Sequence, residues 1–124
     1  MKQLLIIGLG GFVGSIARFL VQKLNLHLHF LSIPFGTLTV NVIGSLIIGF
    51  LIGISAKSDI LSPNLRLFLM VGFCGGFTTF SSFSAENLTL MQNGQLATVL
   101  LYTGISIFLG FLAVYLGYIT SNLL

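Results

Sequence analysis

The chain has 124 residues, of which 56% are hydrophobic and 6% are charged, and its formal net charge is +3. Soluble domains carry about 25% charged residues, so this composition excludes a soluble globular enzyme and a disordered chain. The single cysteine, Cys74, excludes an internal disulfide. No cluster of basic residues indicates a nucleic-acid partner, and the apolar excess predicts contact with membrane lipid instead. The sequence therefore predicts one membrane domain, residues 1–124, without enzymatic activity.

Four apolar stretches are long enough to cross a bilayer, which needs about 20 residues of helix. They cover residues 4–22, 35–56, 65–90 and 96–121. Pro34 and Pro63 are placed to begin the second and third helices, and Asn93-Gly94 is typical of a turn before the fourth. The expected fold class is therefore all-α, a multi-pass protein of the inner (plasma) membrane with four transmembrane helices.

Basic residues are almost evenly divided between the two ends of these helices. If the N-terminus is cytoplasmic, Lys2, Lys57 and Arg66 lie on that side and Lys23 and Arg18 lie toward the other. The positive-inside rule then gives no firm orientation. Either the sample is too small to be informative, or the chain inserts both ways and pairs antiparallel. A chain of four helices also offers little room for a pore within a single subunit, which favours a homodimer.

The third stretch contains a segment that is unusual for a membrane helix. Three glycines fall within five residues, and Thr78 and Thr79 follow them. One interpretation is a face for close helix packing. The other is a helix broken near mid-membrane, because Gly75-Gly76 lacks the side chains that stiffen a turn. Lipid cannot satisfy the backbone groups that a break releases, whereas freed carbonyls suit a hard cation such as Na⁺.

Aromatic residues recur every three positions after these glycines, at Phe77, Phe80 and Phe83, with Ser81 and Ser84 on a neighbouring stripe. Such a stripe can face lipid or pack in a core. Alternatively, the slightly positive ring edges and the hydroxyls hold an anion weakly. Conduction requires binding that permits both entry and exit.

Polar residues also interrupt the second and fourth stretches. Asn41 is the one carboxamide of the second, and it either joins two helices or donates to a passing anion. Thr37 lies four residues earlier on the same face. Tyr102 and Ser106 are four residues apart in the fourth stretch, so they are expected to line one face.

Two charges remain to be explained within the predicted spans. Arg18 either extends toward the nearer membrane surface or supplies positive potential in a vestibule that concentrates anions. Glu86 is expected near the end of the third span, facing water or a partner, as a possible end of an ion pathway. A proton-relay role is the alternative for Glu86, although one carboxylate is thin support for it.

These residues resemble the Fluc (CrcB) family of bacterial fluoride channels. Three segments carry the resemblance, 10–19, 36–45 and 72–84, and the third is the most specific. The resemblance implies a fluoride-selective channel that exports cytoplasmic fluoride passively, driven by the membrane potential, and so gives fluoride resistance. It also implies an antiparallel, dual-topology homodimer with two pores.

The resemblance further implies roles for individual residues. Main-chain carbonyls of Gly75 and Thr78 would hold a structural Na⁺ at the centre of the dimer. Phe80 and Phe83 would contact the permeating ion with their edges. The remaining residues of the implied fluoride pathway are Asn41, Ser81, Ser82, Tyr102 and Ser106, and Thr37 is added because it shares a face with Asn41. Gly110 and Val114 continue the face of Tyr102 and Ser106 but are apolar, so they depart from the polar track that the resemblance implies.

Two other functions fit the composition. A small, dual-topology, proton-coupled multidrug transporter would need a carboxylate deep within a helix. The first span has no acidic residue, and Glu86 is misplaced for that exchange. A non-transporting assembly subunit would account for the glycines but not for the Thr/Ser/Phe cluster.

Overall fold

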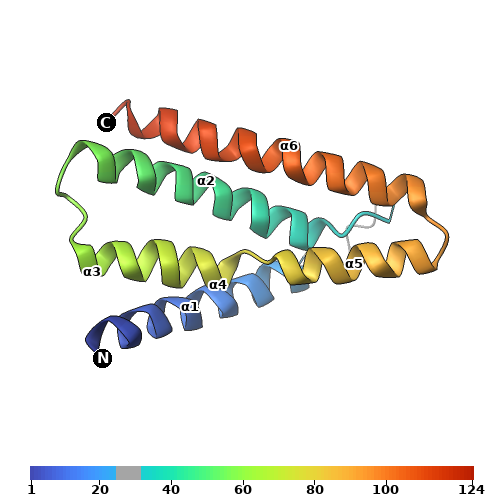
Figure 1. Ribbon diagram of the computed structural model, residues 1–124, viewed down its shortest axis with the longest axis horizontal. Coiled ribbons are helices and arrows are strands. Elements are labelled where there is room, and N and C mark those ends of the chain that lie inside the picture. The colour runs from blue at the N-terminus through green and yellow to red at the C-terminus, as the bar shows by residue number, and fades with distance from the viewer. Residues whose placement is uncertain (25–31) are drawn as a thin grey trace.

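The computed structural model describes residues 1–24 and 32–124 (Figure 1). Three membrane spans are continuous helices, α1 (Lys2–Leu24), α2 (Phe35–Lys57) and α6 (Leu96–Ser121). The other span is built from α3 (Pro63–Arg66), η2 (Leu67–Cys74), α4 (Gly75–Phe77) and α5 (Phe80–Gln92). Most of the connection that the sequence predicts between the first two spans lies outside the described residues.

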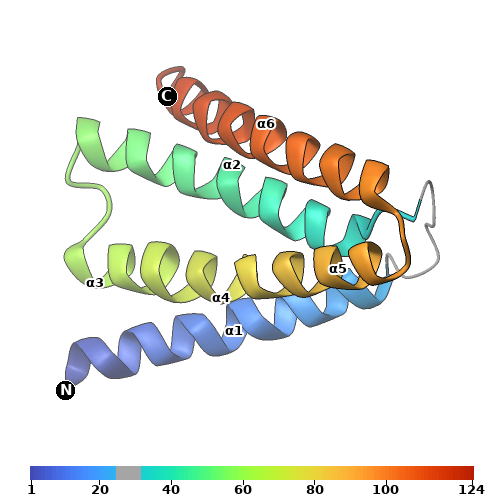
Figure 2. The same cartoon turned by 45° about the vertical axis from the view of Figure 1, so that its right-hand side comes forward.

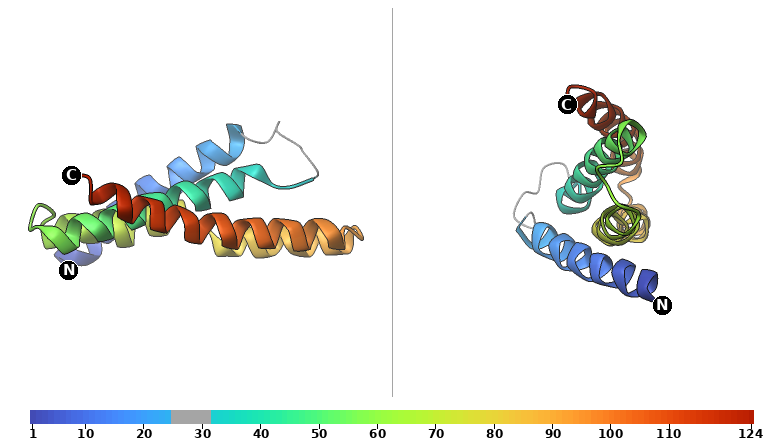
Figure 3. Two further views of the ribbon diagram at one scale, coloured as in Figure 1. Left: turned by 90° about the horizontal axis from the view of Figure 1, so that it is seen from above. Right: turned by 90° about the vertical axis from the view of Figure 1, so that its left-hand side faces the viewer.

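The four spans alternate in direction, and both termini lie at the same end as the connection from α2 to α3 (Figure 1). The third span runs between α2 and α1 (Figure 2). Viewed from the end, α6 and α1 occupy the two outer edges of the molecule (Figure 3). Each of the four spans is long and apolar enough to cross a membrane. The predicted all-α, four-span fold is therefore confirmed.

The helices begin and end where the sequence indicates. Pro34 is the N-cap of α2, and Pro63 occupies the first turn of α3. The Ser62 hydroxyl accepts a hydrogen bond from the Leu65 N–H at 3.2 Å. Gly94 adopts φ +74° in the turn before α6, a conformation that side chains disfavour.

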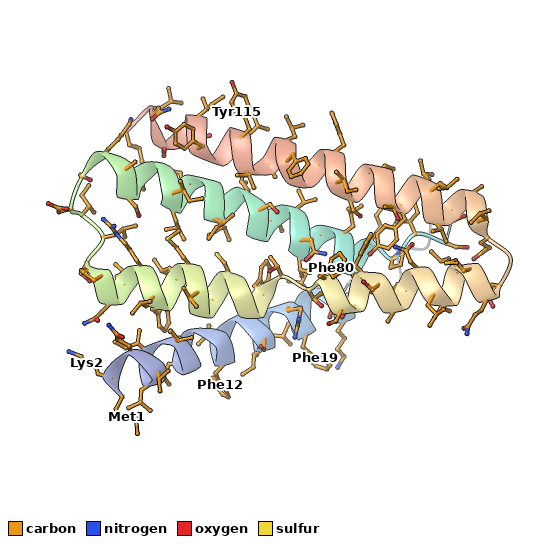
Figure 4. All side chains as sticks on the ribbon, in the orientation of Figure 1. Met1, Lys2, Phe12, Phe19, Phe80 and Tyr115 are labelled. Atoms are coloured by element: carbon orange, nitrogen blue, oxygen red, sulfur yellow. The ribbon has the colours of Figure 1, made fainter. Side chains whose placement is uncertain are left out.

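Large apolar side chains cover the outside of the molecule. Phe12 and Tyr115 are 65% and 61% exposed and point away from the other helices (Figure 4). Water would disfavour so many exposed apolar groups, whereas lipid accepts them. The chain is therefore a multi-pass membrane protein.

Glycines allow α1 and the third span to cross at very short range. A Cβ on Gly72 would lie 2.8 Å from the Gly10 Cα, and one on Gly14 would collide with the Phe73 carbonyl oxygen. Small residues permit such backbone approach in lipid, where packing rather than water expulsion drives association. This crossing fixes the height of the third span against α1.

The third span is interrupted between α4 and α5. Thr78 has φ −85° and ψ 160°, and Thr79 has φ −154° and ψ 116°, so both are extended. The predicted break is confirmed, but its predicted cause is wrong. Gly75 has helical angles of φ −62° and ψ −38°. Gly76 is also helical, and a Cβ on it would lie 2.6 Å from the Gly11 carbonyl oxygen, so it serves packing rather than unwinding.

The span is also wound unusually just before this break. Leu67–Cys74 form a π-helix, which the apolar run LFLMVGFC does not distinguish from an α-helix. π-Helical segments are rare and occur often at functional sites. The π-helix and the break together identify the middle of the third span as the candidate functional region.

Candidate functional site

Asn41, on the neighbouring helix α2, forms hydrogen bonds with the extended backbone at the break. Its Oδ1 accepts from the Thr79 N–H at 2.8 Å, and its Nδ2 donates to the Thr79 carbonyl at 3.1 Å. One carboxamide thereby satisfies both backbone groups of an extended residue that is only 5% exposed. Because unpaired backbone groups are costly at membrane depth, this pair of bonds is what permits the break.

Arg18 reaches the same break from α1. Its Nη1 donates to the Thr78 carbonyl at 3.3 Å. The Thr78 N–H and hydroxyl both donate to the Cys74 carbonyl, at 3.0 Å and 2.9 Å, which ends the helical bonding of α4. The guanidinium therefore places its positive charge beside the broken span. The vestibule role of Arg18 stays a prediction.

The break also changes the bonding of Gly75. In a continuous α-helix the Thr79 N–H would donate to the Gly75 carbonyl, but here it donates to Asn41. A Cβ on Gly75 would meet nothing within 4 Å. Gly75 thus offers a carbonyl that has lost its usual donor, next to open space.

An open cavity of about 480 Å³ lies against the break, between α2, the third span and α6. None of its lining residues in the described part of the chain is charged. The Ser106 hydroxyl is buried there and has no hydrogen-bond partner among the described residues. The predicted site residues that line this cavity are Asn41, Gly75, Thr78, Phe80, Phe83 and Ser106.

Two of the three regularly spaced phenylalanines belong to this cavity. Phe80 is 78% exposed beside the break, and its ring centroid lies 5.8 Å from that of Phe83 (Figure 4). Phe77 is buried instead and stacks on Phe73 at 5.5 Å. The expectation of one continuous stripe is therefore wrong for Phe77, because the extended residues redirect the chain before Phe80.

Ser81 and Ser82 lie at the start of α5 rather than in the lining. The Thr79 hydroxyl accepts from the Ser82 N–H at 3.1 Å and lies 3.3 Å from the Ser81 hydroxyl oxygen. Thr79 is thus the N-cap of α5, a role that Thr immediately before a helix commonly takes. The sequence reasoning did not assign Thr79 a role, although its side-chain type was the available signal.

Thr37 and Tyr102 form a separate buried cluster with Glu86. The Thr37 hydroxyl donates to Glu86 Oε1, and the Tyr102 hydroxyl donates to Glu86 Oε2 at 2.9 Å. Thr37 and Tyr102 are 2% and 0% exposed. Asn41 and Ser106 line the cavity, whereas Thr37 and Tyr102 lie one helical turn away from them, outside its lining. The Phe83 ring lies 5.0 Å from that of Tyr102 and connects the two groups.

Gln22 joins this buried cluster from α1. Its Nε2 donates to the Thr37 hydroxyl oxygen at 3.0 Å. Sequence reasoning gave Gln22 no role, although a carboxamide that interrupts an apolar span was a usable signal. Four helices, α1, α2, α5 and α6, thus each contribute one polar side chain to the cluster.

The chain is similar to known proteins over nearly its full length. The family described as CrcB-like protein, Camphor Resistance (CrcB), matches residues 5–118. A relative from Azobacteroides pseudotrichonymphae genomovar. CFP2, "Fluoride-specific ion channel FluC", is 45% identical over 122 residues, 98% of each chain. Proteins of the same name from Chlorobium luteolum and Bacteroides fragilis are each 47% identical over 120 residues, covering 97% and 94% of this chain and 92% and 94% of theirs.

Proposed function

The chain belongs to the CrcB-like family, and on this premise we propose that it is a fluoride-specific ion channel. The observation that carries the proposal is the match over nearly the full chain to relatives that bear that name. Ion channels catalyse no covalent change, in agreement with a chain that is not an enzyme. The family match also disfavours the multidrug transporter, as do the two hydroxyl donors that occupy Glu86.

The cavity supports this function through the chemistry of its lining. Asn41, Phe80 and Ser106 offer a carboxamide, a ring edge and a hydroxyl, but no cation. Neutral donors and ring edges attract an anion weakly enough to release it again. In this proposal the anion passes through the cavity, and Phe83 is part of its lining.

The driving force follows from acid–base chemistry. Hydrogen fluoride crosses lipid as the neutral acid and ionises at the higher pH of the cytoplasm, where the anion is trapped. A membrane potential that is negative inside then drives fluoride outward through a passive pore, at about 2.3 kcal/mol per charge per 100 mV. The channel needs neither ATP nor a coupling ion.

The working unit in this proposal is an antiparallel homodimer with two pores and a structural Na⁺ at its centre. Gly75 faces open space and its carbonyl has lost its usual donor, so a second copy approaching there would bring two such carbonyls together. The Thr78 carbonyl has a second lone pair beyond the one that accepts from Arg18. Four carbonyls are suitable ligands for this hard cation.

Fluoride efflux from liposomes tests the proposal. Purified protein is reconstituted with potassium fluoride inside, and valinomycin starts the efflux, which a fluoride electrode records. We expect rapid release of fluoride and retention of chloride under the same conditions. Equal release of both anions, or no release above protein-free liposomes, would contradict a fluoride-specific channel.

A further inference from the structure

We infer that Gln22 is a positioning residue of the ion route. From α1 it orients the Thr37 hydroxyl and, through it, holds the Glu86 carboxylate away from the cavity through which the anion passes. This inference rests on the proposed channel function. It concerns a side chain that is outside the lining of the cavity at the break.

The chemistry of the three groups fixes the direction of their hydrogen bonds. An ionised carboxylate can only accept, so the single hydrogen of the Thr37 hydroxyl points toward Glu86 Oε1. The hydroxyl oxygen can then only accept from Gln22, whose Nε2 lies 3.0 Å away. The amide thus keeps the hydroxyl from turning, and the hydroxyl keeps its hydrogen on the carboxylate.

The backbone is shaped for this contact. A Cβ on Gly36 would lie 3.0 Å from the Gln22 Cα and 3.3 Å from the Gln22 carbonyl oxygen. Such short distances leave little room for a side chain, so a glycine at position 36 lets α1 approach α2 closely. Thr37 is the next residue, and the approach brings its hydroxyl within reach of the Gln22 amide.

Among the described residues, the Glu86 carboxylate accepts hydrogen bonds from neutral donors. No ion pair fixes Glu86 within residues 1–24 and 32–124; each of its oxygens accepts from one hydroxyl instead. The guanidinium of Arg18, one turn before Gln22, donates to the Thr78 carbonyl. Glu86 is absent from the lining of the uncharged cavity, and the neighbouring turn of α5 carries Phe83, which lines it. A carboxylate released toward the cavity would repel the passing anion, strongly so in a low-dielectric setting.

The first test is substitution of the amide. Gln22→Met keeps the length of the side chain but removes its donor, and Gln3→Met makes the same change on the exposed first turn of α1. We expect Gln22→Met to slow fluoride efflux about three- to tenfold, as for loss of one hydrogen bond to a charged network. We expect Gln3→Met to conduct at the wild-type rate. Wild-type efflux by Gln22→Met would overturn the inference.

The second test separates positioning from packing. If the released charge of Glu86 causes the loss, Gln22→Met should have no further effect in a Glu86→Gln background. The same factor of loss in both backgrounds would assign Gln22 to packing between α1 and α2 and would overturn the inference. Circular dichroism and the elution volume in detergent check the fold, and Gln22→Ala replaces Gln22→Met if the longer side chain prevents folding.

These measurements keep the two proposals distinguishable. A wild-type protein that releases no fluoride contradicts the channel function and the inference with it. A wild-type protein that conducts fluoride, with equal efflux in the Gln22 and Gln3 variants, retains the channel and removes the role of Gln22.

Discussion

One side chain at the break, that of Asn41, has two roles. Asn41 makes two hydrogen bonds to Thr79, so its predicted roles as interhelical link and as pore residue do not exclude each other. The two bonds consume one amide hydrogen and Oδ1, which leaves the second amide hydrogen available to an anion in the cavity. The residue that allows the helix to break thereby also lines the proposed route.

Replacing Asn41 tests this double use. Asn41→Asp keeps the acceptor for the Thr79 N–H, loses the donor to the Thr79 carbonyl and puts a negative charge at the cavity. We expect fluoride efflux to fall by about tenfold or more, the equivalent of about 1.4 kcal/mol for the lost bond alone. The matched control is Asn93→Asp in the exposed turn after α5, which should conduct normally. Undiminished efflux in Asn41→Asp would remove this residue from the route.

Substitution of Phe80 tests the function of the ring with little expected effect on the stability of the protein. The ring is 78% exposed in one chain, so its loss removes little buried area. We expect Phe80→Ile to slow fluoride efflux several-fold, because an aliphatic side chain has no positive ring edge, while the dimer persists in size-exclusion chromatography. Phe12→Ile, on the outward face of α1, is the control and should leave efflux unchanged. If Phe80→Ile also conducts normally, the ring does not contact the ion.

At the scale of elements, the third span combines tight packing with an interruption. Glycines allow η2 and α4 to pack closely against α1, and the break follows directly after α4. The glycines therefore position the break without causing it. Asn41 and Arg18, from α2 and α1, then satisfy the backbone groups of the two threonines.

A methyl group at the crossing tests the packing role. A Cβ on Gly76 would lie 2.6 Å from the Gly11 carbonyl oxygen, whereas one on Gly104 would meet nothing within 4 Å. We expect Gly76→Ala to destabilise the protein by about 1–3 kcal/mol, the usual cost of overpacking. Gly104→Ala should be neutral or slightly stabilising, because alanine favours a helix. Thermal aggregation in detergent measures both, and equal midpoints would contradict the close crossing.

At the scale of the whole molecule, a single chain leaves its cavity open and Gly75 facing free space. Both features fit the proposed antiparallel dimer, in which a second copy completes the site. Basic residues are nearly balanced between the two ends of the spans, which agrees with insertion in both directions. The proposed dimer and its central ion are properties of the assembled molecule.

Removing sodium tests the proposed central ion. Purification and efflux in N-methylglucamine, a cation too large for a carbonyl site, should slow fluoride release and lower the thermal stability of the dimer. Addition of sodium should restore both, because an ion that binds only the assembled state stabilises it by mass action. Identical behaviour with and without sodium would contradict a structural Na⁺.

The sequence predicts several residues of the site. Residue type and the family resemblance together predict Asn41, Phe80, Phe83 and Ser106 as residues of the ion pathway, and all four line one cavity. Periodicity failed at Phe77, because a helical spacing rule cannot pass through two extended residues. Periodicity groups Thr37 with Asn41 on one face of α2, but it does not reveal that Thr37 contacts Glu86 on α5.

The sequence by itself determined the number of spans and their approximate ends, because bilayer thickness and proline act locally along the chain. It also predicted a break in the third span, although the glycines to which the break was ascribed are helical. Only the tertiary structure decided where the break lies and which groups satisfy it. That outcome depends on Asn41 and Arg18, which are about 38 and 60 residues away from the threonines and act through space. Hydrogen bonds between helices leave no periodic signal in a sequence. The sequence shows Gln22 as a polar interruption of an apolar span, but only the packing of α1 against α2 identifies its partner, Thr37.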